Sequence, residues 1–271
     1  MDDEHRPTRE ERDALRARQL AKSSRWYSPH VHLLVPSSFG FAVIACAIWV
    51  IHDLRWLEVL TIPLTWMIAN ATEWRAHRDL LHARSWIAPV LYDRHTPEHH
   101  MIYTSRDMAM REVREWRLVL IPPYGILLIF LVTCPVTAGL WHLGVPNVAA
   151  LFAATSMGYV VSYEWLHLSY HLGPETWVGR LAILDRLRRQ HAVHHDPRLM
   201  QRKNFNVTVP FWDWVRGTTA TPAEVACAFG TSVTASEFTS EPCGRPAKEA
   251  PADSSSCASA TSSSTSSPAS P

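Results

Sequence analysis

The sequence lacks several features that would place it in a common class of protein. Its 271 residues carry a net charge of only +1, so no excess of positive charge is available to bind a nucleic acid. The start, Met1-Asp2-Asp3-Glu4, is charged and has no apolar core, so we expect no cleavable signal peptide. The motif His-Glu-x-x-His does not occur, which argues against a metalloprotease.

Cysteine is also scarce. The five cysteines are Cys46, Cys134, Cys227, Cys243 and Cys257. None of their spacings resembles the close pairs that hold zinc, and we expect no disulfide framework. Cys46 and Cys134 lie in apolar runs, where cysteine behaves as a small apolar residue.

Charged residues are missing from four stretches, 34–51, 59–72, 118–142 and 143–163. A membrane span needs roughly 20 apolar residues. The last two stretches are long enough and the first is borderline. The second reaches that length only if its helix starts at Trp56 and tolerates Glu58 near the interface. Buried helices of a large soluble domain are the alternative, but runs in back-to-back pairs favour four transmembrane helices in two hairpins.

Basic residues indicate the orientation of these spans. Arginine and lysine are frequent in the amino-terminal segment, in the loop between the second and third spans, and after the fourth span. The turn around Gly144 has none. Because basic loops remain in the cytoplasm, both termini and the central loop are predicted to be cytoplasmic.

Ten of the fifteen histidines fall into four short groups on that predicted side. They are His77 and His82; His95, His99 and His100; His167 and His171; and His191, His194 and His195. Neutral imidazole is the commonest side-chain metal ligand, and ten exceed what one mononuclear site can use. The pattern predicts a dinuclear site with nitrogen ligands. The other five histidines, His5, His30, His32, His52 and His142, are not assigned to it.

Helical spacing predicts how these side chains point. His191, His194 and His195 should share one face, as should His167 and His171. His95 and His99 should also align, with His100 turned by about 100°. His77 and His82 would lie about 140° apart on a regular helix, which suits ligands of different metals or a helix that is ending.

A Glu-Trp pair precedes the first and third histidine groups. Glu73 is four residues before His77, and Glu164 is three residues before His167. Each carboxylate can therefore lie on the face of its histidine, accept the imidazole N–H and fix its tautomer. A glutamate that simply faces water is nearly as good an interpretation for Glu73.

These motifs resemble the fatty acid hydroxylase superfamily, which includes sterol desaturases, carotenoid hydroxylases and fatty acid 2-hydroxylases. The resemblance runs from about Phe39 to Thr218 and rests on the histidine groups, on Tyr163-Glu164, and on the motifs that run from Asn204 to Thr218. Arg117-Leu118-Val119 with Pro122-Pro123 is similar to the 2-hydroxylase branch.

The resemblance implies an all-α integral membrane protein whose cytoplasmic helical cap holds the dimetal site. It implies that all ten grouped histidines are metal ligands, with Tyr163 and Asn204 beside them. It also implies two iron ions, O2, a lipid substrate and a separate electron donor of the cytochrome b5 or ferredoxin type. Zinc is possible as a substitute metal.

The expected function is therefore hydroxylation of an acyl chain, and the resemblance to the 2-hydroxylase branch implies C2 as the position. A lipid or sterol desaturase, or a carotenoid hydroxylase, is the alternative on the same scaffold. A histidine-rich metal transporter is a distant alternative, because transport would place ionisable residues inside the spans. We divide the chain into a charged amino-terminal segment (1–30), a membrane domain (31–219) and a disordered tail rich in Ser, Pro and Ala (220–271).

Overall fold

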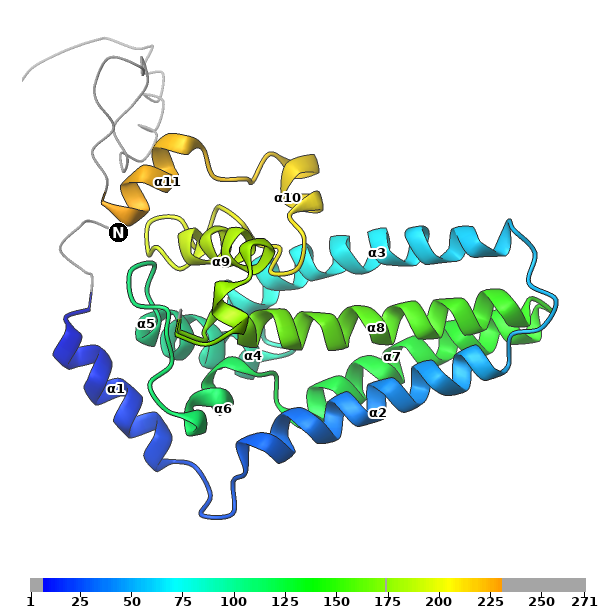
Figure 1. Cartoon of the computed structure of the whole chain (residues 1–271), viewed down its shortest axis with the longest axis horizontal. Helices are drawn as coiled ribbons and strands as arrows, with labels where there is room; N and C mark the ends of the chain where they lie inside the picture. Colours follow the sequence, from blue (N-terminus) through cyan, green and yellow to red (C-terminus); the bar gives the residue numbers. More distant parts are fainter. Residues whose placement is uncertain (1–6, 174, 231–271) are drawn as a thin grey trace, which may run out of the picture.

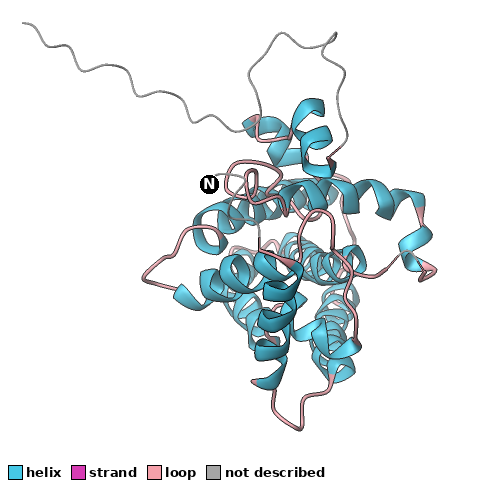
Figure 2. Ribbon diagram, turned by 90° about the vertical axis from the view of Figure 1, so that its left-hand side faces the viewer, coloured by secondary structure: helices cyan, strands magenta, loops and turns pink. Residues whose placement is uncertain are grey.

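The computed structural model describes residues 7–173 and 175–230. These residues form helices and loops with one isolated bridge, between Thr104 and Asp107, and no strand (Figure 2). The long helices are α2 (Pro29–Trp49), α3 (Thr61–Ala76), α7 (Pro123–His142) and α8 (Pro146–Tyr170). They run side by side, and shorter helices gather at one end of the bundle (Figure 1). The predicted all-α class is confirmed for the described residues.

Proline sets the start of three of these helices. Pro29, Pro123 and Pro146 each stand in a first turn, where the missing N–H costs no hydrogen bond. Ser28 adds a side-chain cap by accepting from Val31 N at 3.4 Å. The tight connection from α7 to α8 contains Gly144 with φ of +78°, a conformation that glycine adopts without strain.

Helix α8 is the centre of the bundle and packs against α2, α7 and α3. Gly40 of α2 allows a close approach, because a Cβ atom there would lie 2.5 Å from a methyl carbon of Val161. Trp165 Nε1 donates to Ser37 Oγ at 3.1 Å across the same contact. Helix α7 packs against α8, which follows it after a short turn, whereas α2 and α3 pack chiefly against α8.

The end of the bundle far from the short helices is fixed by Asn147. Its Nδ2 donates to His52 O at 2.8 Å and to a Glu58 carboxylate oxygen at 3.0 Å. Glu58 also accepts from Arg55 N at 2.8 Å, at the start of a short turn, η2 (Glu58–Leu60), that continues into α3. The buried Glu58 carboxylate thereby joins the α2–α3 connection to α8.

Two stretches of the described residues are long and apolar enough to cross a membrane. They are Pro29–Trp49 and Val113–His142, which contains α7. The expected four spans are therefore not all found by this criterion. Helix α3 has only 16 residues. Helix α8 has 25, but its buried Asn147, Ser156 and Glu164 lower its apolar character.

The short helices form a cap over one end of the bundle (Figure 1). They are α1 (Arg9–Ala21), α4 (Pro89–Arg94), α5 (His100–Ile102), α6 (Trp116–Val119), α9 (Ala182–His194), α10 (Phe211–Arg216) and α11 (Pro222–Phe229), with the short turns η3 (His77–Leu81), η4 (His95–His99), η5 (Val113–Glu115) and η6 (Val178–Arg180). The hydrophobic core of the cap includes Ile102, Tyr103, Leu118 and Leu168 and meets the start of α2 at Leu33.

Helix α11 departs from the expectation of a disordered tail from residue 220. Thr221 and Glu224 form a capping box at its start. Ala228 is fully buried against Val193 and Leu199, so α11 belongs to the folded cap. The composition of the whole tail obscured this local signal. The remainder of the expected tail, 231–271, lies outside the described residues, as do residues 1–6 of the amino-terminal segment.

Candidate metal centre

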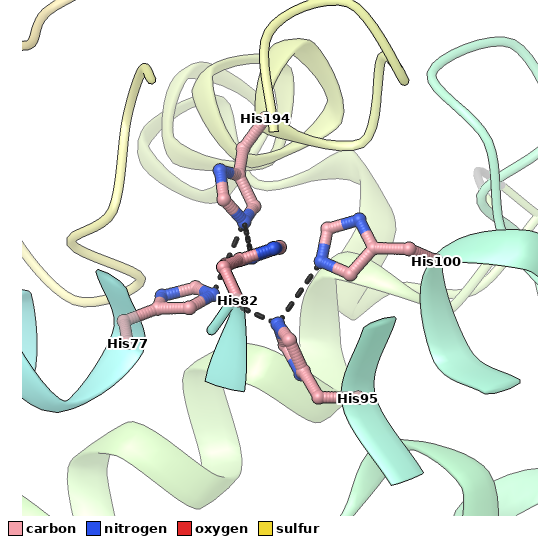
Figure 3. Close-up of side chains that lie close together, drawn as sticks. All are labelled: His77, His82, His95, His100 and His194. Carbon is pink, nitrogen blue, oxygen red and sulfur yellow. Dashed lines mark hydrogen bonds between the residues drawn. The ribbon is translucent and has the colours of Figure 1, made fainter. Parts of the chain in front are cut away.

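All ten grouped histidines are buried, none with more than 7% of its surface exposed. They form two groups, within each of which the possible ligand nitrogens lie within 4.8 Å of one another. Cluster A consists of His77, His82, His95, His100 and His194 (Figure 3). Cluster B consists of His99, His167, His171, His191 and His195. The structure therefore brings together every histidine that the sequence assigned, in two separate sets of five.

Two π-helical turns determine which histidines meet. In η3, His82 N donates to His77 O at 3.1 Å, and in η4 His100 N donates to His95 O. A turn closed between residues five apart places both of them on one face. The expected 140° separation of His77 and His82 is therefore wrong, because it assumed a regular helix. Their rings stack instead, with centroids 5.0 Å apart.

Each histidine triplet is divided between the two clusters. His95 pairs with His100 in cluster A, while His99 points into cluster B. On α9, His191 and His195 belong to cluster B, whereas His194 belongs to cluster A. The three rings of α9 lie 4.6–6.1 Å from one another, as the predicted shared face requires, and this one face contributes ligands to both clusters.

Backbone carbonyls hold the outer nitrogens of five histidines. These contacts join Nδ1 of His77 to Phe205 O (2.5 Å), His99 to Leu118 O (2.9 Å), His171 to Met108 O (2.8 Å), His194 to Lys203 O (2.8 Å) and His195 to Tyr103 O (2.7 Å). A carbonyl oxygen can only accept a hydrogen bond, so each Nδ1 carries the proton. The lone pair of each imidazole is then on Nε2, which faces the cluster.

His82 also carries its proton on Nδ1, because of a contact with Thr96 rather than with a backbone carbonyl. Thr96 Oγ1 donates to Leu81 O at 2.7 Å, which uses its only hydrogen. At 3.2 Å from His82 Nδ1, the hydroxyl must therefore accept. The lone pair of His82 is again on Nε2.

The Nε2 atoms of cluster A lie closer together than unprotonated nitrogens would without a cation or a proton between them. His194 Nε2 is 2.9 Å from His82 Nε2 and 3.1 Å from His77 Nε2 (Figure 3). With all three protons on Nδ1, these contacts have no hydrogen to share. Metal–imidazole bonds of about 2.0–2.1 Å at right angles place two nitrogens about 3 Å apart. The spacing in cluster A thus fits imidazoles around one cation.

Cluster B contains ring nitrogens that form no hydrogen bond with any described residue. His99 Nε2, His171 Nε2 and both nitrogens of His167 are buried and have no hydrogen-bond partner among the described residues. A buried polar atom without a partner is costly, and a metal ion is one explanation for such an atom. His195 Nε2 also lies 3.0 Å from His191 Nε2.

Burial keeps these imidazoles in the form that binds metals. Burial lowers the pKa of His171 and of His194 to about 4. Burial and the neighbouring imidazoles hold the pKa of His95 and His100 well below the ordinary value. Near neutral pH these side chains are therefore uncharged, and protons do not compete for their lone pairs.

The two glutamates do not contact histidine as expected. Glu73 accepts from Val207 N at 2.5 Å and from Thr208 Oγ1 at 2.7 Å. Glu164 accepts from Ile121 N at 3.2 Å. At His77 a backbone carbonyl, Phe205 O, occupies the position that the sequence assigned to Glu73, whereas neither nitrogen of His167 has a hydrogen-bond partner among the described residues. Glu73 acts one step further out, by holding the segment whose carbonyls meet cluster A.

That segment, 203–208, is held by several polar side chains. Asn204 has a left-handed φ of +56°, and its Nδ2 donates to Gln190 O at 3.0 Å. Asp213 accepts from Phe205 N at 2.9 Å and from Asn206 N at 2.8 Å. Asn204 thus supports the carbonyls rather than a ligand directly.

Tyr163 lies beside cluster B, as expected. Its ring packs on His167 with centroids 5.7 Å apart. Tyr159, which sequence reasoning did not single out as a site residue, donates to Glu73. Asp213 was visible only as part of the motifs that run from Asn204 to Thr218, and nothing in the sequence marks the carbonyl groups that accept from the histidines.

Both clusters suit a transition metal. Each offers only imidazole nitrogen, which favours iron, copper, nickel or zinc over calcium and magnesium, because the latter prefer oxygen ligands. Five convergent nitrogens in each cluster also provide more ligands than a structural zinc site uses. The two sets therefore fit two metal ions.

Comparison with known proteins agrees with this chemistry. A family model described as fatty acid hydroxylase matches residues 62–218, more than half of the chain. The match includes all ten histidines of the two clusters together with the segments whose carbonyls hold them. No curated protein and no solved structure matches the chain significantly.

Proposed function

The chain belongs to the fatty acid hydroxylase family, and we propose that it is a membrane-bound oxidoreductase that hydroxylates an acyl chain. The observation that carries this proposal is the pair of five-histidine clusters at one end of an apolar helical bundle. We further propose that the working cofactors are two iron ions, with O2 as the oxidant. Hydroxylation at C2 rests on the likeness of the Arg117–Pro123 region to 2-hydroxylases.

The histidines would hold one metal ion in each cluster. When bound, two iron ions would supply the redox chemistry that attack on an unactivated C–H bond requires. Zinc has no redox chemistry, so zinc in a purified sample would be a substitute. The task of the protein is to present neutral imidazoles in a fixed tautomer and to exclude water around them. The burial of all ten side chains serves both purposes.

The proposed orientation places both termini and both clusters on the cytoplasmic side of a membrane. The abundance of arginine and lysine at the cap end and their absence from the Gly144 turn support it. In this arrangement α2 and α7 contact lipid, consistent with their exposed Phe41, Ile48, Leu128 and Val132. An acyl chain would reach the clusters from the bilayer, with its polar head at the interface.

Electrons would come from a separate protein. O2-dependent hydroxylation needs two electrons in addition to those of the C–H bond, and no redox group besides the proposed metals is implied by the described residues. A cytochrome b5-like or ferredoxin-type donor on the cytoplasmic side would supply them one at a time.

The test supplies membranes containing the full chain with dioxygen labelled with heavy oxygen, a reductant system and iron. We expect labelled oxygen in a new lipid hydroxyl group, detected by mass spectrometry. A new double bond without label would instead assign a desaturase. Unchanged lipids with several electron donors, in protein that contains iron, would contradict both oxidative functions and favour metal handling.

The matched variants are His194→Ala and His142→Ala. His194 is fully buried in cluster A, and its loss should abolish hydroxylation and reduce the iron content. His142 is exposed at the opposite end of the bundle, so its substitution should change neither. Both proteins should still insert into membranes. Unchanged iron content in His194→Ala would contradict the assignment of cluster A as a metal site.

A further inference from the structure

The carbonyl groups that orient the histidines come from two separate segments, one for each cluster. Segment 203–208 supplies Lys203 O and Phe205 O to cluster A. Segment 103–118 supplies Tyr103 O, Met108 O and Leu118 O to cluster B. A shift of segment 203–208 would therefore move ligands of cluster A, and a shift of segment 103–118 would move ligands of cluster B.

Glu115 fixes segment 103–118 from inside. It is fully buried, and its carboxylate accepts from Tyr103 OH at 2.6 Å and from Arg111 N at 3.0 Å. Tyr103 is itself fully buried, and its ring packs on His171 with centroids 4.7 Å apart. The Glu115 carboxylate thus holds Tyr103, whose carbonyl oxygen bonds to His195, and also the backbone at Arg111, three residues after Met108.

Helix α1 supplies the charge that balances this carboxylate. Arg16 is 5% exposed, and its Nε donates to Glu115 at 3.1 Å. Its guanidinium also lies over the Tyr103 ring, 5.7 Å from the centroid. A buried carboxylate without such a partner would be strongly unfavourable.

Further ion pairs fasten α1 along the same segment. Arg12 of α1 contacts Asp107 at 2.9 Å, and Asp13 contacts Arg111 at 2.7 Å. Figure 1 shows α1 outside the bundle, next to the cap. Its polar side chains therefore bind mainly to the segment that serves cluster B.

We propose that Arg16 is a positioning residue for the cluster B metal, acting through Glu115 and Tyr103 on His195. The inference rests on the proposed metal centre. The segment whose carbonyls hold cluster A is fixed by Asp213 and Glu73 rather than by α1. Loss of the Arg16–Glu115 contact releases segment 103–118 and weakens cluster B alone. The amino-terminal helix is in this way part of the metal site.

The experiment measures iron bound per chain in the purified full-length protein and in variants. Arg16→Met should reduce the iron content from about two to about one, by weakening one site. Substitutions behind metal ligands typically lower metal affinity about 10–100-fold. Tyr103→Phe should act in the same direction, because it removes the hydroxyl that bonds to Glu115 but keeps the carbonyl that bonds to His195. Arg16→Lys should retain more iron than Arg16→Met.

Two backgrounds identify the cluster that loses its metal. His82→Ala should leave cluster B loaded, and addition of Arg16→Met should then remove most of the remaining iron. His171→Ala should leave cluster A loaded, and addition of Arg16→Met should then change little. Equal losses in the two backgrounds would overturn the proposal, as would no loss in either.

Matched controls separate positioning from general damage. Arg9→Ala removes an exposed arginine of the same helix, with a side chain 79% accessible, and should leave both metals in place. Asp213→Asn should weaken cluster A instead of cluster B. If Arg16→Met does not fold, Arg16→Met combined with Glu115→Gln removes the unbalanced charge, and Tyr103→Phe leaves the ion pair intact. A wild-type protein that binds no metal would refute the proposed function itself, whereas a loaded wild type with an indifferent Arg16→Met refutes only this inference.

Discussion

At the scale of single residues, the site depends on which nitrogen of each imidazole carries the proton. Carbonyl oxygens bind Nδ1 of five histidines and leave Nε2 for the metal. Such contacts need no particular side chain on the carbonyl residue. The sequence could therefore identify the ten ligands by type and spacing, but it could not identify Phe205 or Met108 as their supports. Glu73 and Glu164 were predicted to accept from the histidines because a sequence shows the side chains but not where the backbone carbonyls lie.

The low pKa values predict a loss of stability in acid for the metal-free protein. His171 and His194 have a pKa of about 4 in the folded state, against an ordinary value of 6.5. Below pH 6.5 the unfolded chain takes up protons that the folded chain does not accept until about pH 4. The free energy of unfolding should thus fall over this window as the pH falls, by roughly 3 kcal/mol for each of the two histidines.

Denaturant unfolding of chelator-treated protein in detergent, followed by circular dichroism between pH 7 and pH 4, checks this. His194→Gln should show a shallower decline, and His142→Ala should match the wild type. A free energy of unfolding that does not change over this range would contradict the prediction.

At the scale of elements, the long helices were easier to predict than the short ones. The uncharged runs located α2 and α7 because lipid-facing helices need apolar residues on every side. The π-turns at His77 and His95 were not predicted, since helical spacing arguments assume a regular helix. Helix α11 was missed for a different reason. The Thr221–Glu224 capping box indicates the start of this helix. The Ser-, Pro- and Ala-rich composition of residues 220–271 nevertheless led to a prediction of disorder for the whole tail.

Removal of α11 should destabilise the cap. Ala228 O accepts from Ser105 Oγ at 3.2 Å, and Cys227 O accepts from Arg198 at 3.1 Å. A chain that stops after Thr221 loses these contacts and exposes Val193 and Leu199. We expect a melting temperature lower by several degrees, whereas a chain that stops after Gly230 keeps every described contact of α11.

Thermal unfolding of both truncated proteins in detergent measures the difference. The substitution Thr221→Ala provides a milder version, because loss of an N-cap costs about 1 kcal/mol. Equal melting temperatures for the two truncations would show that α11 contributes nothing to the fold.

At the scale of the whole molecule, polar and apolar parts are divided along the bundle. The ten grouped histidines and most arginines are at the cap end, and the turn after α7 is at the other (Figure 1). The sequence predicted this division from charge alone. It did not predict that α8 would be the central helix, because contacts between helices depend on side-chain shape, such as the approach at Gly40, rather than on hydropathy.

Cysteine labelling tests the orientation in sealed vesicles. In a background without native cysteines, Leu143→Cys should react with an impermeant reagent only from the non-cytoplasmic side. Leu143 is suitable because it is 78% exposed and adjoins the α7–α8 turn. Arg9→Cys, on the exposed side of α1, should react only from the cytoplasmic side. Labelling of both positions from the same side would refute the proposed topology.

The π-turn at His77 has a consequence for insertions and deletions. It contains one more residue than an α-helical turn, and that residue brings His82 onto the face of His77. Insertion of one residue between them would rotate His82 by about 100° away from that face. Deletion of one residue would instead leave the pair four apart, a spacing that shares a face in a regular α-helix. The intervening segment, 78–81, should therefore tolerate a deletion better than an insertion, even where the side chains involved have no role of their own.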